Sequence, residues 1–220
     1  MVPMPVTLLV PSPSYYATHV APEPESDILI DPLLAAPMDP AHPPPLWWDV
    51  GEHPNAIKLG SIGEPHARQL SHDDLASPAV RSGRGSPQKL KKMTLVFPGL
   101  PLVINIEPDD RPVWTSTPLH YLTVGDVLYG LYRSLRLSVE RSEFDKQSAS
   151  MKESMRRAFE RRRDRDSRAN WEKNTHHGVR YVDFLGEMRR LVGLRAAVGE
   201  EIPYGKRRGE VFVVKLAPAH

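Results

Sequence analysis

The feature that most constrains the fold is an amphipathic segment near the middle of the chain, residues 122–135. Thr123 and Asp126 have the spacing of a helix N-cap and its N3 acid, which together form a capping box. Apolar residues follow at helical spacing, within a stripe about 100° wide that is typical of one buried helix face: Val124, Val127, Leu128, Leu131 and Leu135. We therefore expect a core helix over about 124–137 that carries no chemistry of its own.

The N-terminal part differs in composition from the rest of the chain. Twelve of the 23 prolines lie in residues 1–45, and residues 1–57 contain seven acidic residues and no Lys or Arg. Residues 58–220 therefore hold 29 basic and 20 acidic residues, a net charge of +9. Because proline and acid dominate residues 1–27, we expect a disordered Pro-rich tail that buries little surface.

Composition also limits the compartment and the chemistry. The chain has no cysteine, which excludes disulfides, thiolate nucleophiles and Cys-ligated zinc and fits a reducing compartment. No run approaches the roughly 18 apolar residues needed to span a membrane. The apolar segment 6–10 lacks the length and the basic n-region of a signal peptide. We expect a soluble cytoplasmic or nuclear protein with no membrane contact.

Strand-like segments are short and rich in β-branched and aromatic residues. After an apolar arm at 28–34, the predicted strands are 46–50, 93–97, 102–106, 113–115 and 210–216. The turn between 97 and 102 predicts a hairpin. The last strand is mostly apolar, which places it in the centre of the sheet.

Helical patterns follow the opening helix at about 142–165 and, from a cap at Asp183, at 184–192 with Gly193 ending the helix. The order of elements predicts an α+β domain over residues 28–217. We expect a small, mostly antiparallel sheet of four to five strands packed by three helices, with a low-complexity loop at about 61–92.

Arginines gather in the second predicted helix, over residues 152–168, but they flank an acidic stripe on both sides. The i,i+4 spacing of Glu153 and Arg157 is typical of a solvated helix with ion pairs. The arginines that we take as candidates for an interaction surface are Arg156, Arg161, Arg163 and Arg165. The alternative is that this helix and the basic loop 81–92 bind nucleic acid or another polyanion.

Four further residues are singled out by their positions. Arg162 continues an apolar line of the same helix, so it should reach the core edge and find a carboxylate or carbonyl partner in a buried ion pair. Trp47 and Trp48 must face opposite sides of a strand, and we take Trp48 as the contact residue. Ser77 and Ser86 each precede proline and are candidate phosphorylation sites.

We predict no catalytic residue, no cofactor and no metal site. The His176-His177 pair has no further ligand nearby, and no nucleophile elbow, Walker loop or zinc-protease motif occurs. Our first hypothesis is a non-catalytic module that binds another protein through its sheet edge or tail. A third hypothesis, after polyanion binding, is an enzyme with a pocket near one of four residues: Asp49, His120, Asp183 or His177.

Several motifs, taken in order, resemble a known domain family. They are Leu46-Trp47-Trp48-Asp49-Val50, Leu122-Thr123-Val124-Gly125-Asp126-Val127-Leu128, Arg157-Ala158-Phe159, and His177-Gly178-Val179-Arg180-Tyr181-Val182-Asp183-Phe184-Leu185-Gly186. Over about residues 28–217 the chain is similar to a domain of unknown function found in many copies in mushroom-forming fungi. In that family the closing strand usually starts with Trp, which Glu210-Val211-Phe212 replaces here. The resemblance implies an intracellular α+β domain and brings no activity with it.

Overall fold

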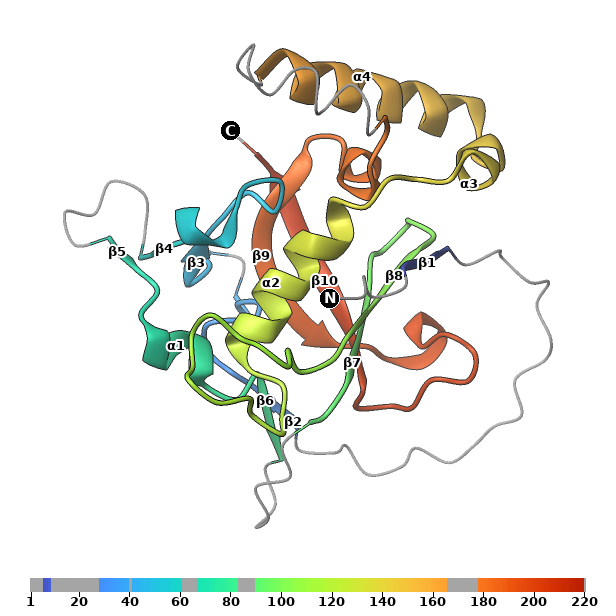
Figure 1. Cartoon of the computed structure of the whole chain (residues 1–220). Helices are drawn as coiled ribbons and strands as arrows, with labels where there is room; N and C mark the ends of the chain where they lie inside the picture. The colour runs from blue at the N-terminus through green and yellow to red at the C-terminus, as the bar shows by residue number, and fades with distance from the viewer. Residues whose placement is uncertain are drawn as a thin grey trace.

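The structure, a computed structural model, describes residues 6–8, 28–39, 41–60, 67–82, 90–165 and 178–219. Its centre is a five-stranded sheet with the order β1-β8-β7-β10-β9 (Figure 1). The strands are β1 (Val6–Leu8), β7 (Met93–Val96), β8 (Leu102–Ile106), β9 (Met188–Ala196) and β10 (Val211–Pro218). Neighbouring strands are antiparallel except β7 and β10, which are parallel. The predicted α+β class with mostly antiparallel sheets is confirmed.

The hairpin and the closing strand lie where the sequence placed them. β7 and β8 pair from Met93 opposite Ile106 to Val96 opposite Val103. β10 lies between β7 and β9, with Val211 and Phe212 fully buried, as its apolar sequence predicted. The predicted strand at 113–115 is wrong, because these residues form a turn that buries Trp114.

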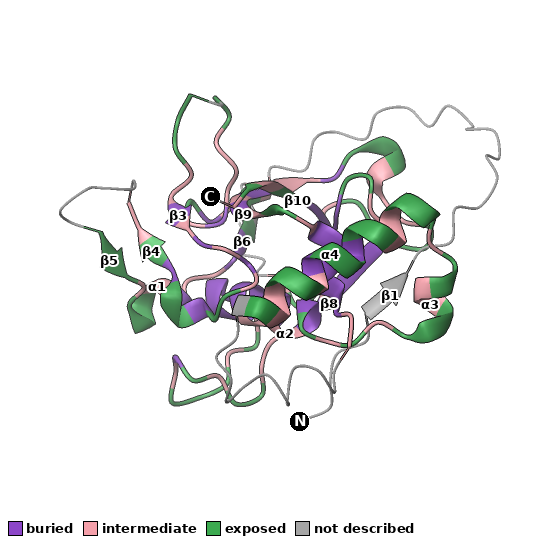
Figure 2. Cartoon of the chain, turned by 90° about the horizontal axis from the view of Figure 1, so that it is seen from above, coloured by how far each residue is buried: buried purple, intermediate pink, exposed green. Residues whose placement is uncertain are grey.

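Helix α2 (Val124–Leu135) crosses one face of this sheet (Figure 1). The capping box is present: the Asp126 N–H donates to Thr123 Oγ1 at 3.0 Å, and the Thr123 N–H donates to Asp126 Oδ2 at 2.8 Å. All five residues of the predicted stripe are at most 1% exposed. Figure 2 shows purple, buried residues along the strands and α2, whereas α4 is largely green on its outer side.

Two smaller sheets and a short helix flank the centre. β2 (Ile28–Ile30) pairs with β6 (Val80–Ser82), and β3 (Leu46–Trp47), β4 (Lys58–Leu59) and β5 (Arg68–Gln69) form the other sheet. α1 (His72–Ala76) and the 3-10 helix η1 (Pro54–Ala56) lie beside them. The prediction of a low-complexity loop at 61–92 is therefore wrong for β5, α1 and β6, where Leu75 and Ala79 join the core. Residues 61–66 and 83–89 lie outside the described residues.

The helix predicted at 184–192 is wrong. A short 3-10 helix, η2 (Tyr181–Leu185), ends at Gly186, whose φ of 57° suits glycine. The chain then enters β9, which pairs along its length with β10. Gly193, predicted as a helix stop, lies inside β9 at φ 139°, where a Cβ atom would sit 2.5 Å from the Ala36 backbone nitrogen. The pairing skips Val192, so this glycine belongs to a β-bulge.

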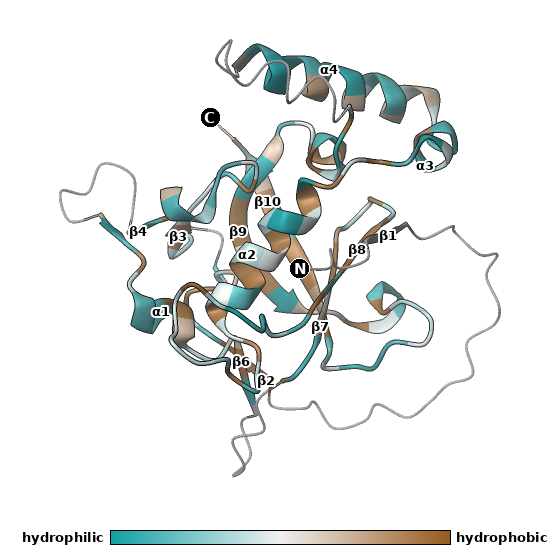
Figure 3. Cartoon of the chain, viewed as in Figure 1, coloured by the Kyte–Doolittle hydropathy of each residue, from teal (hydrophilic) through white to brown (hydrophobic). Residues whose placement is uncertain are grey.

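The helix predicted at 142–165 is two helices, α3 (Arg141–Asp145) and α4 (Ala149–Arg165). α4 packs on η2 through Met155 and Ala158, at one end of the sheet. Its ribbon is mostly teal in Figure 3, in contrast to the brown strands of the sheet. A last 3-10 helix, η3 (Gly199–Glu201), follows β9.

Residues 6–8 correct the prediction for the tail. They form β1, which pairs antiparallel with β8, whereas the rest of 1–27 lies outside the described residues. The arm at 28–34 packs on the core as predicted, with Leu34 fully buried. Within the described part of the chain, no helix is long and apolar enough to cross a membrane.

Candidate interaction surface

The α4 arginines predicted as contact residues lie among acidic side chains. The exposed pairs are Arg157–Glu153 (3.0 Å), Arg156–Glu153 (4.0 Å), Arg161–Glu187 (3.4 Å) and Arg163–Asp164 (3.2 Å). Arg156 also lies 5.7 Å from the centre of the Phe144 ring. The side chain of Arg165 lies outside the described residues. The outer surface of α4 therefore presents both charge signs rather than a continuous basic stripe.

The basic loop 81–92 is described only at its ends. Arg81 lies 4.0 Å from Asp31, and Lys92 lies 3.5 Å from Glu210. Ser86 lies outside the described residues. Ser77 is half-buried as the C-cap of α1, and its carbonyl accepts the Val124 N–H at the start of α2.

Arg162 occupies a different environment from the other α4 arginines. Its Nε and Nη2 donate to the two carboxylate oxygens of Asp183 at 3.1 and 2.9 Å, and Nη2 also donates to the Gly178 carbonyl at 3.0 Å. The two side chains are 14% and 2% exposed. Asp183 Oδ2 also accepts the Arg180 N–H at 2.8 Å. The ion pair fastens α4 to η2, with the carboxylate and carbonyl partners that the sequence position required.

A tyrosine beneath α3 adds a second polar contact to this region. The Tyr181 hydroxyl donates to Glu143 Oε2 at 2.5 Å. Burial raises the pKa of Tyr181 well above the usual tyrosine value, and the hydrogen bond to the negative Glu143 carboxylate raises it further. The phenol therefore stays protonated in the folded chain at pH values where an exposed tyrosine ionises.

This pKa shift predicts an alkaline loss of stability. Above pH 10, unfolded Tyr181 releases its proton while folded Tyr181 keeps it, so the folded state binds more protons. The free energy of unfolding then falls as pH rises, by up to about 1.4 kcal/mol per pH unit. We expect the stability difference between wild type and Tyr181→Phe to shrink by about 1 kcal/mol between pH 9 and pH 11, measured by urea unfolding. Tyr204→Phe, at a fully exposed tyrosine, is the control. An unchanged difference would contradict the role given to Tyr181.

The choice of Trp48 as the contact tryptophan is wrong. Trp48 is 1% exposed, and its Nε1–H donates to the Glu52 carbonyl at 3.0 Å. Trp47 is half-buried, and the Arg190 guanidinium lies 5.1 Å from the centre of its ring. The alternation along the strand is as expected, but it is Trp47 that reaches the surface.

A surface that the sequence did not single out lies beside α2. We call it the tyrosine patch: His53, Tyr129, Tyr132 and Arg136. The His53 ring meets Tyr129 and Tyr132 edge-on, at centroid distances of 5.8 and 5.1 Å. The Arg136 guanidinium lies 5.2 Å from the centre of the Tyr132 ring. Val113, which is 71% exposed, directly precedes Trp114, a residue whose ring packs near Tyr129.

The tyrosines of this patch are held by their neighbours. The Tyr129 hydroxyl donates to Asn55 Oδ1 at 2.7 Å, and its ring lies 5.1 Å from the ring of buried Trp114. Trp114 can lie there because residue 125 is glycine. A side chain at this position would place its Cβ atom 2.5 Å from the indole. Burial raises the pKa of Tyr129, so its phenol stays protonated at neutral pH. Half-buried aromatic rings fixed in this way lose little side-chain entropy when a partner covers them.

The carboxylates considered for catalysis are bound to arginines. Asp49, named above as a possible pocket residue, lies 3.1 Å from Arg189, and Asp109, a further carboxylate near α2, accepts Arg133 Nη1 at 2.6 Å. Burial opposes ionisation of Asp109, but the hydrogen bonds from Arg133 and the Arg111 N–H outweigh it and hold its pKa below the usual value. His120 is exposed, and His177 lies outside the described residues. In the described ranges, no three His, Asp or Glu side chains gather closely enough to hold one metal ion.

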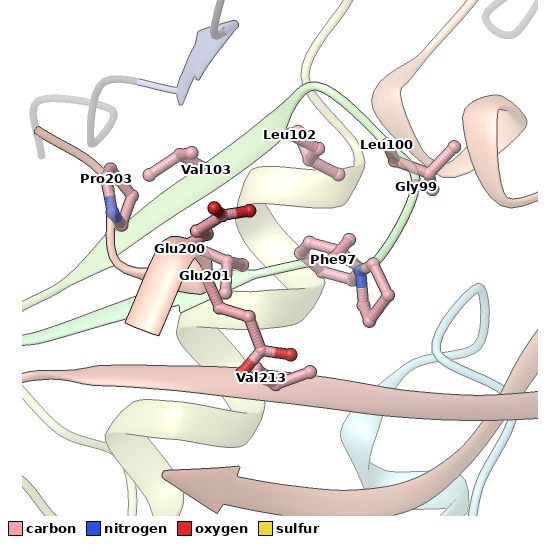
Figure 4. Close-up of a pocket in the computed structure, with 11 residues that line it drawn as sticks. Phe97, Gly99, Leu100, Leu102, Val103, Glu200, Glu201, Pro203 and Val213 are labelled. Atoms are coloured by element: carbon pink, nitrogen blue, oxygen red, sulfur yellow. The ribbon is translucent and has the colours of Figure 1, made fainter. Parts of the chain in front are cut away.

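A pocket of about 220 Å³ opens at the end of the sheet, between the β7–β8 turn and η3 (Figure 4). Val96, Val103 and Val213 are among its apolar lining residues, and Glu200 and Glu201 line it as well. Arg195 Nη1 donates to Glu201 at 2.7 Å, and this hydrogen bond lowers the pKa of Glu201 to about 2. Across the described residues, Glu200 has no ion-pair partner.

Comparison with protein families matches residues 46–207 to a family of unknown function, DUF6699. The chain belongs to this family. No curated protein and no solved structure matches it. The DUF6699 match includes the tyrosine patch, α4 and the pocket carboxylates. Both β1 and β10 lie outside the matched residues, although β10 is central to the sheet.

Proposed function

We propose that this DUF6699 chain is a non-catalytic protein-interaction domain, and that another protein covers its tyrosine patch. The observation that carries the proposal is the fixed pair of half-buried tyrosines on α2, in contact with His53 and Arg136. Tyr and Arg are enriched at protein interfaces and dominate their binding energy. Exposed Val113 is the chain neighbour of Trp114, whose ring lies 5.1 Å from that of Tyr129. The chemistry of the patch suits a partner with an apolar or aromatic centre and a nearby carboxylate for Arg136.

The sequence likeness to a domain of mushroom-forming fungi supports a fungal origin for the chain. It also supports an intracellular location, cytoplasmic or nuclear, with which the cysteine-free composition agrees. We propose both the fungal origin and the intracellular location.

Polyanion binding is the alternative, supported by the net charge of residues 58–220. The acidic neighbours of the α4 arginines argue against it, because they offset the charge that phosphates would meet. Titration with duplex DNA and with RNA at two salt concentrations separates the two functions. Affinity that falls steeply as salt rises would support the alternative, and no binding at low salt would end it.

Photo-crosslinking in the native cell tests the tyrosine patch. A photoreactive amino acid at exposed Val113 places the probe next in the chain to Trp114, whose ring packs near Tyr129. The same amino acid at Met38, which is fully exposed, is the matched control. We expect one discrete crosslinked protein from position 113 that position 38 does not capture.

A second change shows whether the crosslink depends on the patch. Arg136→Ala in the Val113 probe chain removes an exposed patch residue without opening the core. We expect the crosslink yield to fall at least about tenfold, since interface arginines are frequent hot spots. Equal yields with and without Arg136, or identical products from positions 113 and 38, would contradict the proposed surface.

A further inference from the structure

The two edges of the central sheet are closed in different ways. Beyond β9, the chain's own segments cover the edge: the Leu191 N–H donates to the Trp48 carbonyl at 2.9 Å, and the Val50 N–H donates to the Arg189 carbonyl at 2.8 Å. Beyond β8, β1 is the strand that closes the edge within the described part of the chain, and its ladder holds three residue pairs. An edge strand offers a row of backbone donors and acceptors to any extended segment that reaches it.

β1 is joined to the rest of the described domain by a long connection. It lies outside residues 46–207, which match DUF6699, whereas β8 lies inside them. Residues 9–27 separate β1 from β2, a connection of 19 residues that can extend to roughly 60 Å. Such a long connection places little constraint on where residues 6–8 bind, so another segment can replace them on β8.

The register along β8 defines what such a segment must present. Leu102 and Ile104 belong to the main core, on the α2 side of the sheet, and are at most 1% exposed. Val103 lies on the opposite face with Val96 and Val213, and these three valines line the pocket, which Phe97 and Leu102 also line beside the β7–β8 turn. Residues directly opposite each other in an antiparallel pair share a face. In a segment docked on β8, the residues opposite Leu102 and Ile104 therefore face the core. The residue between them, opposite Val103, lies beside the pocket.

The pocket favours a cation at that middle position. Its valine lining is apolar, which suits the methylene stem of lysine or arginine. Of its two carboxylates, Glu201 is neutralised by Arg195, so Glu200 is the carboxylate left to attract a charged head group. In this chain the position opposite Val103 is held by Thr7, which carries no charge.

We propose that the β8 edge is a docking site for an extended segment of another protein, and that residues 6–8 compete for it from within the chain. The segment runs antiparallel to β8, with apolar residues opposite Ile104 and Leu102 and a lysine or arginine opposite Val103. The inference rests on the proposed function only in that the partner is a protein. It concerns a surface separate from the tyrosine patch.

Peptide binding to the full-length chain tests this proposal. The probe is a fluorescent peptide with the sequence of residues 3–11, followed by fluorescence anisotropy. Thr7→Pro removes a backbone N–H from β1 and should release it from β8. Thr18→Pro makes the same change outside β1 and is the matched control. Because an internal competitor acts at millimolar effective concentration, we expect the Thr7→Pro chain to bind the peptide at least about tenfold more tightly than wild type or Thr18→Pro.

The cation is tested with a second peptide that carries Thr7→Lys. We expect it to bind the Thr7→Pro chain about fivefold more tightly than the first peptide at low salt, because an exposed ion pair contributes up to about 1 kcal/mol. Glu200→Gln in the protein should remove this preference and leave the affinity for the uncharged peptide unchanged.

Three results would overturn the proposal. The first is equal peptide affinity for wild type, Thr7→Pro and Thr18→Pro. The second is a preference for the lysine peptide that survives Glu200→Gln. The third is a wild-type dimer that Thr7→Pro abolishes, because the occupant of the β8 edge would then be a second copy of this chain. A peptide that binds as expected while the Val113 crosslink fails would remove the tyrosine patch and leave the β8 site standing. A Val113 crosslink that forms as expected while the peptide fails to bind would remove the β8 site and leave the tyrosine patch standing.

Discussion

Replacing Leu131 with aspartate is expected to abolish cooperative folding. Leu131 lies in the centre of the buried stripe of α2 and is 1% exposed. Truncating a buried leucine costs about 2–5 kcal/mol. Burying an unpaired carboxylate adds several more, or forces the group to take up a proton. The sum is comparable to the roughly 5–15 kcal/mol that holds a typical domain together.

Thermal unfolding followed by near-UV circular dichroism measures this result directly. We expect wild type to show a sigmoidal transition and Leu131→Asp to show none. Leu29→Asp is the matched control, because Leu29 is 59% exposed and its substitution should shift the midpoint by only a few degrees. A native-like transition for Leu131→Asp would mean that α2 does not pack on the sheet through this face.

Arg162→Met is expected to be the most damaging substitution in α4. Asp183 is 2% exposed and would lose the guanidinium that pairs with it, while the Gly178 carbonyl would lose a donor. Removing one member of a buried ion pair costs about 3–5 kcal/mol. Arg157→Met removes an arginine from the exposed side of the same helix, where the pair with Glu153 contributes about 0.5 kcal/mol or less.

Urea unfolding of the two variants gives the comparison. We expect the midpoint of Arg162→Met to fall far below that of Arg157→Met, with Arg157→Met close to wild type. Because Arg162 holds α4 on η2, the backbone amides of α4 should also exchange hydrogen faster in Arg162→Met under native conditions. Equal midpoints for the two variants would show that the Arg162–Asp183 pair does not hold α4 in place.

The elements that the sequence predicted well are those whose structure is determined locally. α2 has its cap and its buried face within 14 residues, so periodicity alone was enough to define it. The hairpin of β7 and β8 and the closing strand are similarly marked by apolar runs with turn residues between them. Arg162 was identified for the same reason, since its place on a helical wheel showed that it had to be buried.

The error at 184–192 has a non-local cause. Phe184, Leu185, Met188, Leu191 and Val192 have helical spacing, and a glycine follows them. Pairing with β10, about 20 residues further along the chain, stabilises a strand instead. Gly193 ends no helix there. It allows the chain to pass the Ala36 backbone within the strand.

The candidate surface was only partly accessible from the sequence. The i,i+3 spacing of Tyr129 and Tyr132 places them on one side of α2, but His53 joins them from a distant part of the chain. For Trp47 and Trp48, strand alternation predicts that the two side chains face opposite sides of the sheet. It does not predict which of them is buried, because that depends on where the core lies.

The most direct test of the proposed function is the affinity of the crosslinked partner, once purified, for the wild-type chain and for patch variants. Isothermal titration calorimetry should show at least about tenfold weaker binding for Arg136→Ala and for Tyr132→Ala, with melting temperature measured in parallel to confirm folding. The exposed variant Val198→Ala, away from the patch, should bind as wild type does. Affinities unchanged by Arg136→Ala and Tyr132→Ala would contradict the claim that this protein binds its partner through the tyrosine patch.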